Sequence, residues 1–496
     1  MNFNINFTIL APEILLTVLA FVIIIIGLLI SDKSKNMLGY ISAAGLLASL
    51  VYVIGNGMTE KASYFYDSLV VDPLSQVFKL IFLIVSLIAV IASIEYFKDN
   101  RNQDEYYALI LLSTVGMMVV ASANDLIALF VGFELASMST YVLAGFEKKN
   151  PASLEAAMKY FIIGSLSSAL MLFGMSLIYG ITSTTNIPGI IEFFRSAPLM
   201  AESSLGVLAM IFLVAGFGFK MALVPFHMWA PDTYEGSPSV VSSLLAAGSK
   251  KMGFVAAFKV LVLALVAIRA DVQFTFAILA IITMTYGNVV ALSQRSIKRM
   301  LAYSSIAQAG YIALAFVVTT PMSIAGGVLL ALGHALMKGG AFIAVAVVGY
   351  MVLSDDKNAK NIDDLENFAG LGKRAPITAL GFFVFFLALA GIPPSAGFIG
   401  KLLLFYSITV QAISQSSSWL LLVVIIAILN SALSIYYYAR VIKYMYVLPP
   451  KGEKIKEPTA YVVAILIAVI GTIGIGLYPE PFIIMAKNAA QVVLGV

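Results

Sequence analysis

The amino-acid sequence predicts an all-α protein that crosses a lipid bilayer about fourteen times. Three observations lead to this fold class: 61% of the 496 residues are hydrophobic, only 11% are charged, and long apolar runs recur from one end of the chain to the other. Soluble domains carry about 25% charged residues. A charged fraction as low as the one found here excludes a soluble enzyme, a nucleic-acid-binding protein and a disordered chain.

The predicted spans are apolar windows bounded by charged residues, by proline and glycine, or by serine and asparagine. They are 8–30, 37–56, 72–97, 104–122, 125–146, 153–180, 205–230, 238–269, 272–294, 299–319, 323–351, 377–410, 418–447 and 459–483. No basic residue precedes the first window, and that window is long enough to stay in the bilayer. We therefore expect no cleaved signal segment.

Lysine and arginine counts in the loops predict the orientation. The odd-numbered loops hold 18 of these residues and the even-numbered loops hold 3. Basic residues are enriched in cytoplasmic loops. The sequence thus predicts an integral, multi-pass protein of a prokaryotic cytoplasmic membrane or its organelle equivalent, with both termini on the outer side.

The chain contains no cysteine, which excludes disulfides, thiolate zinc sites and cysteine-ligated iron–sulfur clusters. It also lacks a glycine-rich phosphate loop following a strand. We therefore expect this chain to bind no metal, flavin, cluster or nicotinamide of its own.

An internal repeat is indicated by three matches at nearly one offset, 168 to 170 residues. The matched pairs are Tyr141 with Tyr311, Gly164 with Gly333, and Pro225 with Pro393. They predict a duplicated unit of five helices, and an odd number of helices requires that the second copy be inverted. Chance similarity among apolar helices is the alternative.

The repeat divides the chain into four predicted parts, with proline breaks in the seventh and twelfth spans. The parts are an N-terminal three-helix segment (1–103), a first five-helix repeat (104–271), a second, inverted repeat (272–447) and a C-terminal helix (448–496).

Ionisable side chains within the predicted spans are the main functional signal. Besides Glu134 and His334, they are Lys79, Lys159, Lys220, Lys250, Lys251, Lys259, Lys338 and Lys401. An ionised group at the centre of the bilayer costs roughly 2.5–3.5 kcal/mol on insertion scales. Such residues must face a hydrated or paired interior, and their number points to function.

Six of these residues fall near the middle of their spans: Glu134, Lys220, Lys250, His334, Lys338 and Lys401. A row of titratable groups at one depth is typical of lateral proton conduction. Burial lowers the pKa of a lysine towards neutrality, and a nearby carboxylate raises it again. Since Glu134 is the one carboxylate at that depth, it is the natural partner of Lys220.

Each residue also has a structural interpretation. We interpret Lys79, Lys251 and Lys259 as lysines that snorkel or pack against loop acids, whereas Lys159 either snorkels or joins the proton uptake path. Glu134 and Lys220 could instead form a static ion pair that holds two helices together. His334 could make an ordinary interhelical hydrogen bond.

The loop Pro225 to Ser239 contains no lysine or arginine. It places His227, Asp232, Tyr234 and Glu235 beside the broken seventh span. These residues are predicted to form a polar mouth that feeds protons to Lys220. A turn with solvated acids is the alternative.

Four segments carry a resemblance to a known family: GFELASMSTYVL, GFGFKMALVPFHMWAPDTYEGSPS followed by SK, GHALMKGGAF, and LAGIPPSAGFIGK. Together they resemble the antiporter-like proton-pumping subunits of respiratory complex I, a family that includes subunits of Mrp-type antiporters and membrane-bound hydrogenases. The opening APEILL, the DPLS motif and the fourteen spans look most like the N-type subunit.

The resemblance implies two inverted five-helix units and a set of roles. Glu134 and Lys220 would be the coupling ion pair, Lys250 the central relay, His334 and Lys338 the bridging segment, and Lys401 the exit-side lysine. It implies a proton-translocating subunit of an NADH:quinone-type oxidoreductase, with other membrane-arm subunits as partners. Quinone, flavin and iron–sulfur clusters would lie in those other subunits.

Two other functions stay open. A subunit of an Mrp-type sodium/proton antiporter or a membrane-bound hydrogenase would depend on sodium or on different partners. A purely structural membrane subunit would tolerate neutral residues in place of the buried charges. The sequence does not distinguish NADH, ferredoxin and coenzyme F420 as electron donors.

Overall fold

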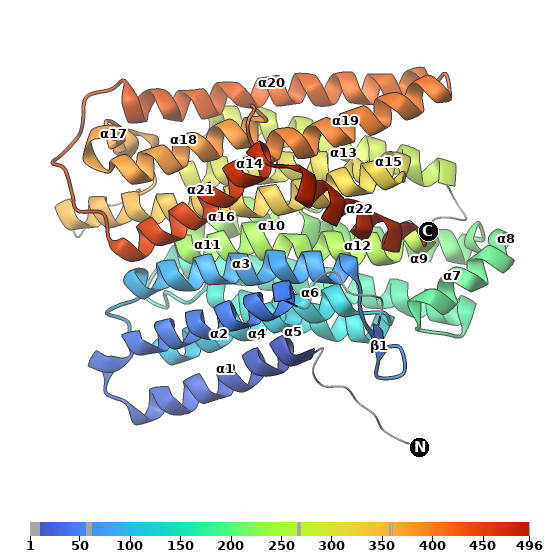
Figure 1. Ribbon diagram of the computed structural model, residues 1–496, viewed down its shortest axis with the longest axis horizontal. Helices are drawn as coiled ribbons and strands as arrows, with labels where there is room; N and C mark the ends of the chain where they lie inside the picture. Colours follow the sequence, from blue (N-terminus) through green and yellow to red (C-terminus); the bar gives the residue numbers. More distant parts are fainter. Residues whose placement is uncertain (1–9, 56–61, 265–268, 357–358, 360, 496) are drawn as a thin grey trace.

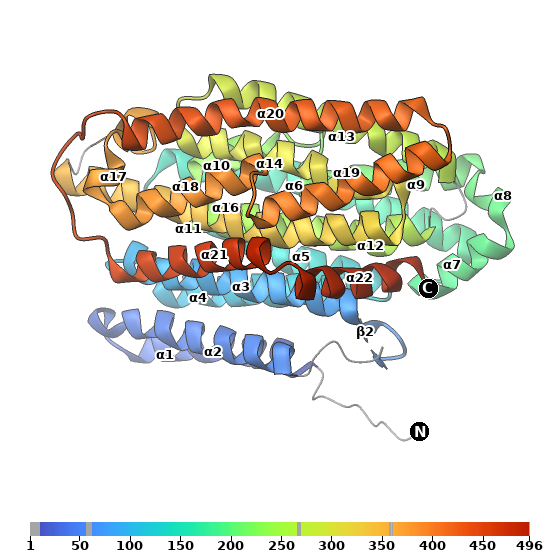
Figure 2. The same ribbon diagram turned by 45° about the horizontal axis from the view of Figure 1, so that its top comes forward.

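The computed structural model describes residues 10–55, 62–264, 269–356, 359 and 361–495. Long helices run side by side along the molecule, and a short hairpin of β1 (Ala62–Tyr64) and β2 (Leu69–Val71) lies at one end (Figures 1 and 2). Lys61, Lys357 and Lys360, which entered the predicted orientation, and the predicted start of the first span lie outside the described residues.

The helices follow one another along the chain with short connections. They are α1 (Ala11–Leu29), α2 (Asn36–Gly55), α3 (Pro73–Tyr96), α4 (Gln103–Ser122), α5 (Leu126–Ala144), α6 (Pro151–Thr182), α7 (Ile187–Ser196), α8 (Pro198–Ala201), α9 (Ser204–Met221), α10 (Trp229–Gly236), α11 (Ser239–Leu244), α12 (Lys250–Ala264), α13 (Arg269–Ser293), α14 (Ile297–Ala313), α15 (Ala315–Val318), α16 (Pro321–Asp355), α17 (Leu371–Arg374), α18 (Pro376–Ala390), α19 (Ala396–Ser414), α20 (Ser418–Tyr446), α21 (Thr459–Leu477) and α22 (Glu480–Leu494).

Thirteen helical segments within the described residues are long and apolar enough to cross a membrane, and α18 is a shorter apolar helix. The thirteen correspond to all but one of the predicted spans. The exception, 238–269, is divided by a π turn at Leu245–Ser249 that separates α11 from α12. The prediction of an all-α polytopic membrane protein is confirmed.

Several predicted boundaries are wrong. The last predicted span, 459–483, is two helices, because α21 ends at Leu477 and α22 begins at Glu480. Pro479 separates them, since proline cannot donate a hydrogen bond to the preceding turn. The loop before the seventh span contains α7 and α8, and α13 begins at Arg269, three residues before the predicted span 272–294.

Both predicted helix breaks are present. The chain leaves the helical conformation between α9 and α10 near Pro225, and between α18 and α19 near Pro393. Gly391 ends α18 with a φ of +86°, which favours glycine because it has no Cβ. Ser395 then caps α19 by accepting a hydrogen bond from the Phe398 amide. Carbonyl groups at such breaks are released from the helical ladder and can accept other donors.

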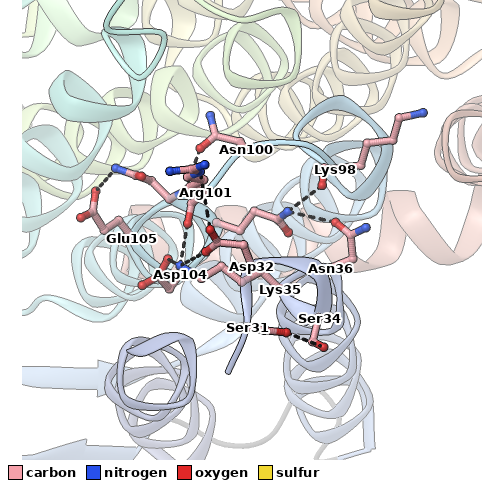
Figure 3. Close-up of polar contacts among 12 residues, drawn as sticks. Ser31, Asp32, Ser34, Lys35, Asn36, Lys98, Asn100, Arg101, Asp104 and Glu105 are labelled. Carbon is pink, nitrogen blue, oxygen red and sulfur yellow. Dashed lines mark hydrogen bonds and ion pairs between the residues drawn. The ribbon is translucent and has the colours of Figure 1, made fainter. Parts of the chain in front are cut away.

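A network of charged side chains ties the α1–α2 hairpin to α4 (Figure 3). The Lys35 ammonium donates to the Asp104 carboxylate (3.1 Å) and to the Arg101 carbonyl (2.6 Å), and it also lies 3.7 Å from Asp32. Asp32 in turn lies 3.5 Å from the guanidinium of Arg101. Lys35 and Asp104 are buried, so this network anchors the outermost helices at one end.

A second ion pair joins α1 to α3. The Lys79 ammonium lies 2.6 Å from the Glu13 carboxylate, and both side chains are buried. Lys79 was expected to snorkel or to meet a loop acid. Instead its partner is in the first turn of a membrane-spanning helix.

We predict that Lys79→Met destabilises the protein by about 3–5 kcal/mol, because it leaves Glu13 buried without its partner. The thermal unfolding midpoint of the purified complex should fall, and the double variant Glu13→Gln/Lys79→Met should recover most of the loss. Lys487→Met on the exposed face of α22 is the control. An unchanged midpoint for Lys79→Met would contradict a stabilising role for the pair.

Candidate proton-conducting site

The candidate site is a row of five lysines and one histidine, all of them buried in the helical interior. They are Lys220 of α9, Lys250 and Lys251 of α12, His334 and Lys338 of α16, and Lys401 of α19. Within the described residues, no carboxylate lies within ion-pair distance of any of these five lysines. Their ammonium groups are held by hydroxyl and carbonyl oxygens, and this polar lining makes their burial possible.

The expected ion pair between Glu134 and Lys220 is not formed in this structure. The half-buried Glu134 carboxylate accepts a hydrogen bond from the Ser168 hydroxyl of α6 (2.5 Å). The Lys220 ammonium donates to the hydroxyls of Ser137 and Tyr160, both at 2.9 Å. Ser137 lies one turn after Glu134 on the same face of α5. Glu134 of α5 and Lys220 of α9 are thus bound within one turn of each other along α5, and each has its own neutral partner.

Aromatic rings surround the Lys220 ammonium. It lies 5.6 Å from the ring centroid of Phe133, 5.7 Å from Tyr141 and 5.2 Å from Tyr160. Electron-rich ring faces stabilise a cation without supplying a formal negative charge. These three rings therefore belong to the surroundings of the buried ammonium group as well as to the packing between helices.

The Tyr160 hydroxyl connects Lys220 with the start of α12. Besides its bond to Lys220, it lies 3.5 Å from the hydroxyl of Ser249, the residue before Lys250. The Tyr160 ring stacks on Trp229 at 4.6 Å with an angle of 14° between the planes. This stacking fixes the ring, so a hydroxyl bridge leads from the first lysine of the row towards the second.

Lys250 and Lys251 point in different directions, because successive residues of a helix are about 100° apart. Lys250 donates to the carbonyl (2.7 Å) and hydroxyl (3.2 Å) of Ser305 on α14. Lys251 donates to the Ala246 carbonyl in the π turn (2.8 Å) and lies 2.5 Å from Nδ1 of His334. The expectation that Lys251 snorkels or packs against a loop acid is wrong.

Polar residues of α14 line the second half of the row. Lys338 donates to the Ser304 hydroxyl (2.7 Å) and to the Leu301 carbonyl (2.9 Å). The amide of Gln308 donates to the Leu389 carbonyl (2.8 Å) at the break that follows α18. The sequence offered a signal for these residues, since serine and glutamine are uncommon inside an apolar span.

Lys401 binds the helix break directly. Its ammonium donates to the carbonyls of Leu389 (3.0 Å) and Ala390 (3.3 Å) and to the Ser431 hydroxyl (3.0 Å). It also lies 4.4 Å from the ring centroid of Tyr311. The break in this helix thus supplies oxygen acceptors to a lysine that has no nearby carboxylate.

A cavity of about 420 Å³ opens between α6, α10 and α14. Among the residues that line it are Glu155, Lys159, Asp232, Glu235, Lys298 and Arg299. Lys159 and Arg299 contact Asp232 at 2.7 and 2.8 Å, and Arg299 contacts Glu235 at 2.6 Å. Partial burial opposes ionisation of Asp232, but the hydrogen bonds from Lys159 and Arg299 hold the pKa of its carboxyl below the usual value.

Only two of the four residues predicted for this mouth line the cavity, Asp232 and Glu235. Tyr234 is fully buried against Trp229, and its hydroxyl has no partner within the described residues. His227 lies in the break after α9, with its ring 4.6 Å from that of Tyr286. The loop has no lysine or arginine of its own, and Lys159 of α6 and Arg299 of α14 supply these side chains.

The two remaining interior lysines, Lys79 and Lys259, lie outside this row. Lys79 pairs with Glu13, and Lys259 of α12 donates to the Ala123 carbonyl at the end of α4 (2.8 Å). Both lysines therefore have a structural contact of their own.

A bundle of membrane-spanning helices with an interior row of lysines joined through hydroxyls defines an ion-translocating membrane subunit. The chain belongs to the family described as NADH:quinone oxidoreductase/Mrp antiporter, TM, whose profile matches residues 123–434. The family predicted from the sequence motifs is confirmed.

Named relatives cover nearly the whole chain. F(420)H(2) dehydrogenase subunit N of Methanosarcina mazei is 55% identical over 495 residues, 98% of each chain. NADH-quinone oxidoreductase subunit N of Trichlorobacter lovleyi is 39% identical over 496 residues, 99% of this chain and 98% of the relative. A chain of respiratory complex I from Thermus thermophilus is 30% identical and superimposes with a TM-score of 0.78, covering 95% of this chain and 98% of that one.

The geometry at Gly391 gives a test of the Lys401 site. A methyl group there would be strained at φ +86° and would lie 3.1 Å from Cδ of Lys401. We expect Gly391→Ala to cost about 1–2 kcal/mol for the left-handed conformation alone, which should lower the thermal unfolding midpoint. Gly180→Ala is the control, since no atom lies within 4 Å of the added group. Equal midpoints for the two variants would contradict this account.

Proposed function

We propose that this chain is the N-type, proton-translocating subunit of a complex I-like oxidoreductase. It moves protons through its row of buried lysines while electron transfer takes place in other subunits. The observation that carries the proposal is the burial of Lys220, Lys250, Lys251, Lys338 and Lys401 among hydroxyl, carbonyl and imidazole partners, with no carboxylate within ion-pair distance among the described residues. A purely structural subunit gives no reason to bury five ammonium groups without a carboxylate.

Protons enter the row from the cavity at Asp232 and reach Lys220. The Tyr160 and Ser249 hydroxyls then lead from Lys220 to Lys250. The polar residues of α14 continue the path: Ser305 bonds to Lys250, Ser304 bonds to Lys338, and Gln308 shares the Leu389 carbonyl with Lys401. Release occurs from Lys401 to the outer side.

Glu134 acts as the switch. Its carboxylate is held by Ser168 in this structure, while Lys220 binds the hydroxyl of Ser137 one turn away. A charge change in a neighbouring subunit can favour or disfavour direct pairing of Glu134 with Lys220. Pairing holds the proton on Lys220, and separation in a desolvated site releases it.

The assignment extends to topology, partners and cofactors. The start of α1 and the end of α22 lie toward the same end of the bundle (Figure 1), in line with both termini on the outer side of a prokaryotic cytoplasmic membrane. The two inverted units at 104–271 and 272–447 each contain one of the broken helices. Other membrane-arm subunits are the partners, and flavin, iron–sulfur clusters and quinone are bound elsewhere in the complex.

The more similar of the two named relatives belongs to an F(420)H(2) dehydrogenase. We therefore favour a complex of that type over one that oxidises NADH. An Mrp-type antiporter subunit is the second candidate, since the chain superimposes on a chain of the Mrp complex from Dietzia with a TM-score of 0.82 at 18% identity. That likeness concerns the fold. Sodium dependence of transport and the absence of redox partners would identify an antiporter.

The proposed function predicts that Lys220→Met and Glu134→Gln reduce proton translocation by the assembled complex by at least about tenfold, since a positioned proton-transfer group contributes about 10²–10⁴-fold. Tyr160→Phe should also slow it, because it removes the bridging hydroxyl. Acidification of inverted vesicles and donor oxidation are measured together.

Lys487→Met on the exposed face of α22 is again the control, and co-purification of the partner subunits checks assembly. Pumping at the wild-type rate in assembled Lys220→Met and Glu134→Gln complexes would refute the proposal.

A further inference from the structure

The contact between Lys251 and His334 joins two fully buried bases from different helices. Nζ of Lys251 on α12 lies 2.5 Å from Nδ1 of His334 on α16. A hydrogen bond between two nitrogens needs one donor and one acceptor. Only one of the two nitrogens can therefore direct a proton at the other. A single proton lies between Nζ of Lys251 and Nδ1 of His334.

The surroundings of this pair favour a mobile proton. The electrostatic neighbours of His334 are Lys250, Lys251, Lys338 and Lys401, all of them bases. A fixed positive charge on the pair is repelled by any neighbour that is protonated, and the effect is strong in a medium of low dielectric constant. The position of one proton in the cluster thus depends on the protonation of the others.

The second ring nitrogen of His334 supplies a route onward. Nε2 is buried and has no hydrogen-bond partner within the described residues, and ring geometry directs it away from Lys251. Buried polar atoms are normally satisfied, so an unpartnered one calls for a functional reason. An imidazole that accepts a proton at one nitrogen can release another from the second nitrogen.

The π turn before α12 positions Lys251. Its Nζ also donates to the Ala246 carbonyl at 2.8 Å, within the turn Leu245–Ser249. This bond holds the ammonium at the side of α12 that faces α16, whereas Lys250 is directed to Ser305 on α14. Two adjacent lysines therefore lead to two different helices.

We infer that Lys251 and His334 form a proton-transfer pair, a direct connection from α12 to α16 beside the connection from Lys250 to α14. In the transfer, an N–H bond of the Lys251 ammonium breaks and an N–H bond forms at Nδ1 of neutral His334. The resulting imidazolium loses its Nε2 proton to the next base on the Lys401 side. A turn of the ring restores the starting tautomer. This inference rests on the proposed function.

The sharpest variant is His334→Asn. The amide oxygen of asparagine lies near the position of Nδ1, so it can accept the hydrogen bond from Lys251 and preserve the contact between helices. It cannot carry a proton. A purely structural contact predicts pumping at the wild-type rate, whereas a transfer pair predicts a loss of at least about tenfold, near the lower limit for a positioned proton-transfer group.

Lys251→Arg provides an independent test if His334→Asn does not assemble. The guanidinium keeps the charge and the donor but does not release a proton near neutral pH. We expect a similar loss of pumping, and no additional loss in the double variant, because the two residues act in one step. Lys259→Met, which removes another buried lysine of α12, is the matched control and should pump at the wild-type rate.

Proton translocation and donor oxidation are measured in the assembled complex, with Lys220→Met in the same series. If Lys220→Met stops pumping while His334→Asn and Lys251→Arg do not change it, the pair is structural and the inference is overturned, although the proposed function stands. If Lys220→Met is also without effect, the proposed function itself fails.

Discussion

The burial of ammonium groups in an apolar interior is the constraint on which the rest of this structure depends. Each buried lysine loses its hydration and, in the row from Lys220 to Lys401, gains no carboxylate in return within the described residues. The fold compensates with neutral oxygen atoms and aromatic rings. Such partners stabilise a charge less strongly than a carboxylate does, and the proposed proton transfer along the row depends on this difference.

The irregular parts of the backbone supply many of these oxygen atoms. The break after α18 provides two carbonyls for Lys401, and the π turn before α12 provides one for Lys251. In a regular helix each interior carbonyl already accepts a bond from the next turn, so a further donor must share it, as Lys250 and Lys338 do at Ser305 and Leu301 of α14. Helix breaks at membrane depth are tolerated where they are buried in protein, and here they lie beside the lysines that use them.

The pair Glu134 and Lys220 differs from the rest of the row. Glu134 is held by the Ser168 hydroxyl of α6, and Lys220 is held by the Ser137 hydroxyl, which lies one turn after Glu134 on α5. An exchange of partners therefore needs movement of side chains and no change of fold. In the proposed function, this exchange is the switch that a neighbouring subunit controls through its charge.

The sequence by itself determined the fold class, the approximate position of the membrane spans, both helix breaks and the identity of the family. Hydropathy, proline and glycine act locally, so these features are readable along the chain. Only the tertiary structure decided which side chains meet: that Lys251 contacts His334, that Tyr160 and the polar residues of α14 join the lysines, and that Lys159 and Arg299 complete the mouth. The physical reason is that lipid tails are as apolar as a protein core. The hydropathy of a membrane helix therefore indicates poorly which of its faces turns inward. Two lysines adjacent in the sequence, Lys250 and Lys251, accordingly contact different helices.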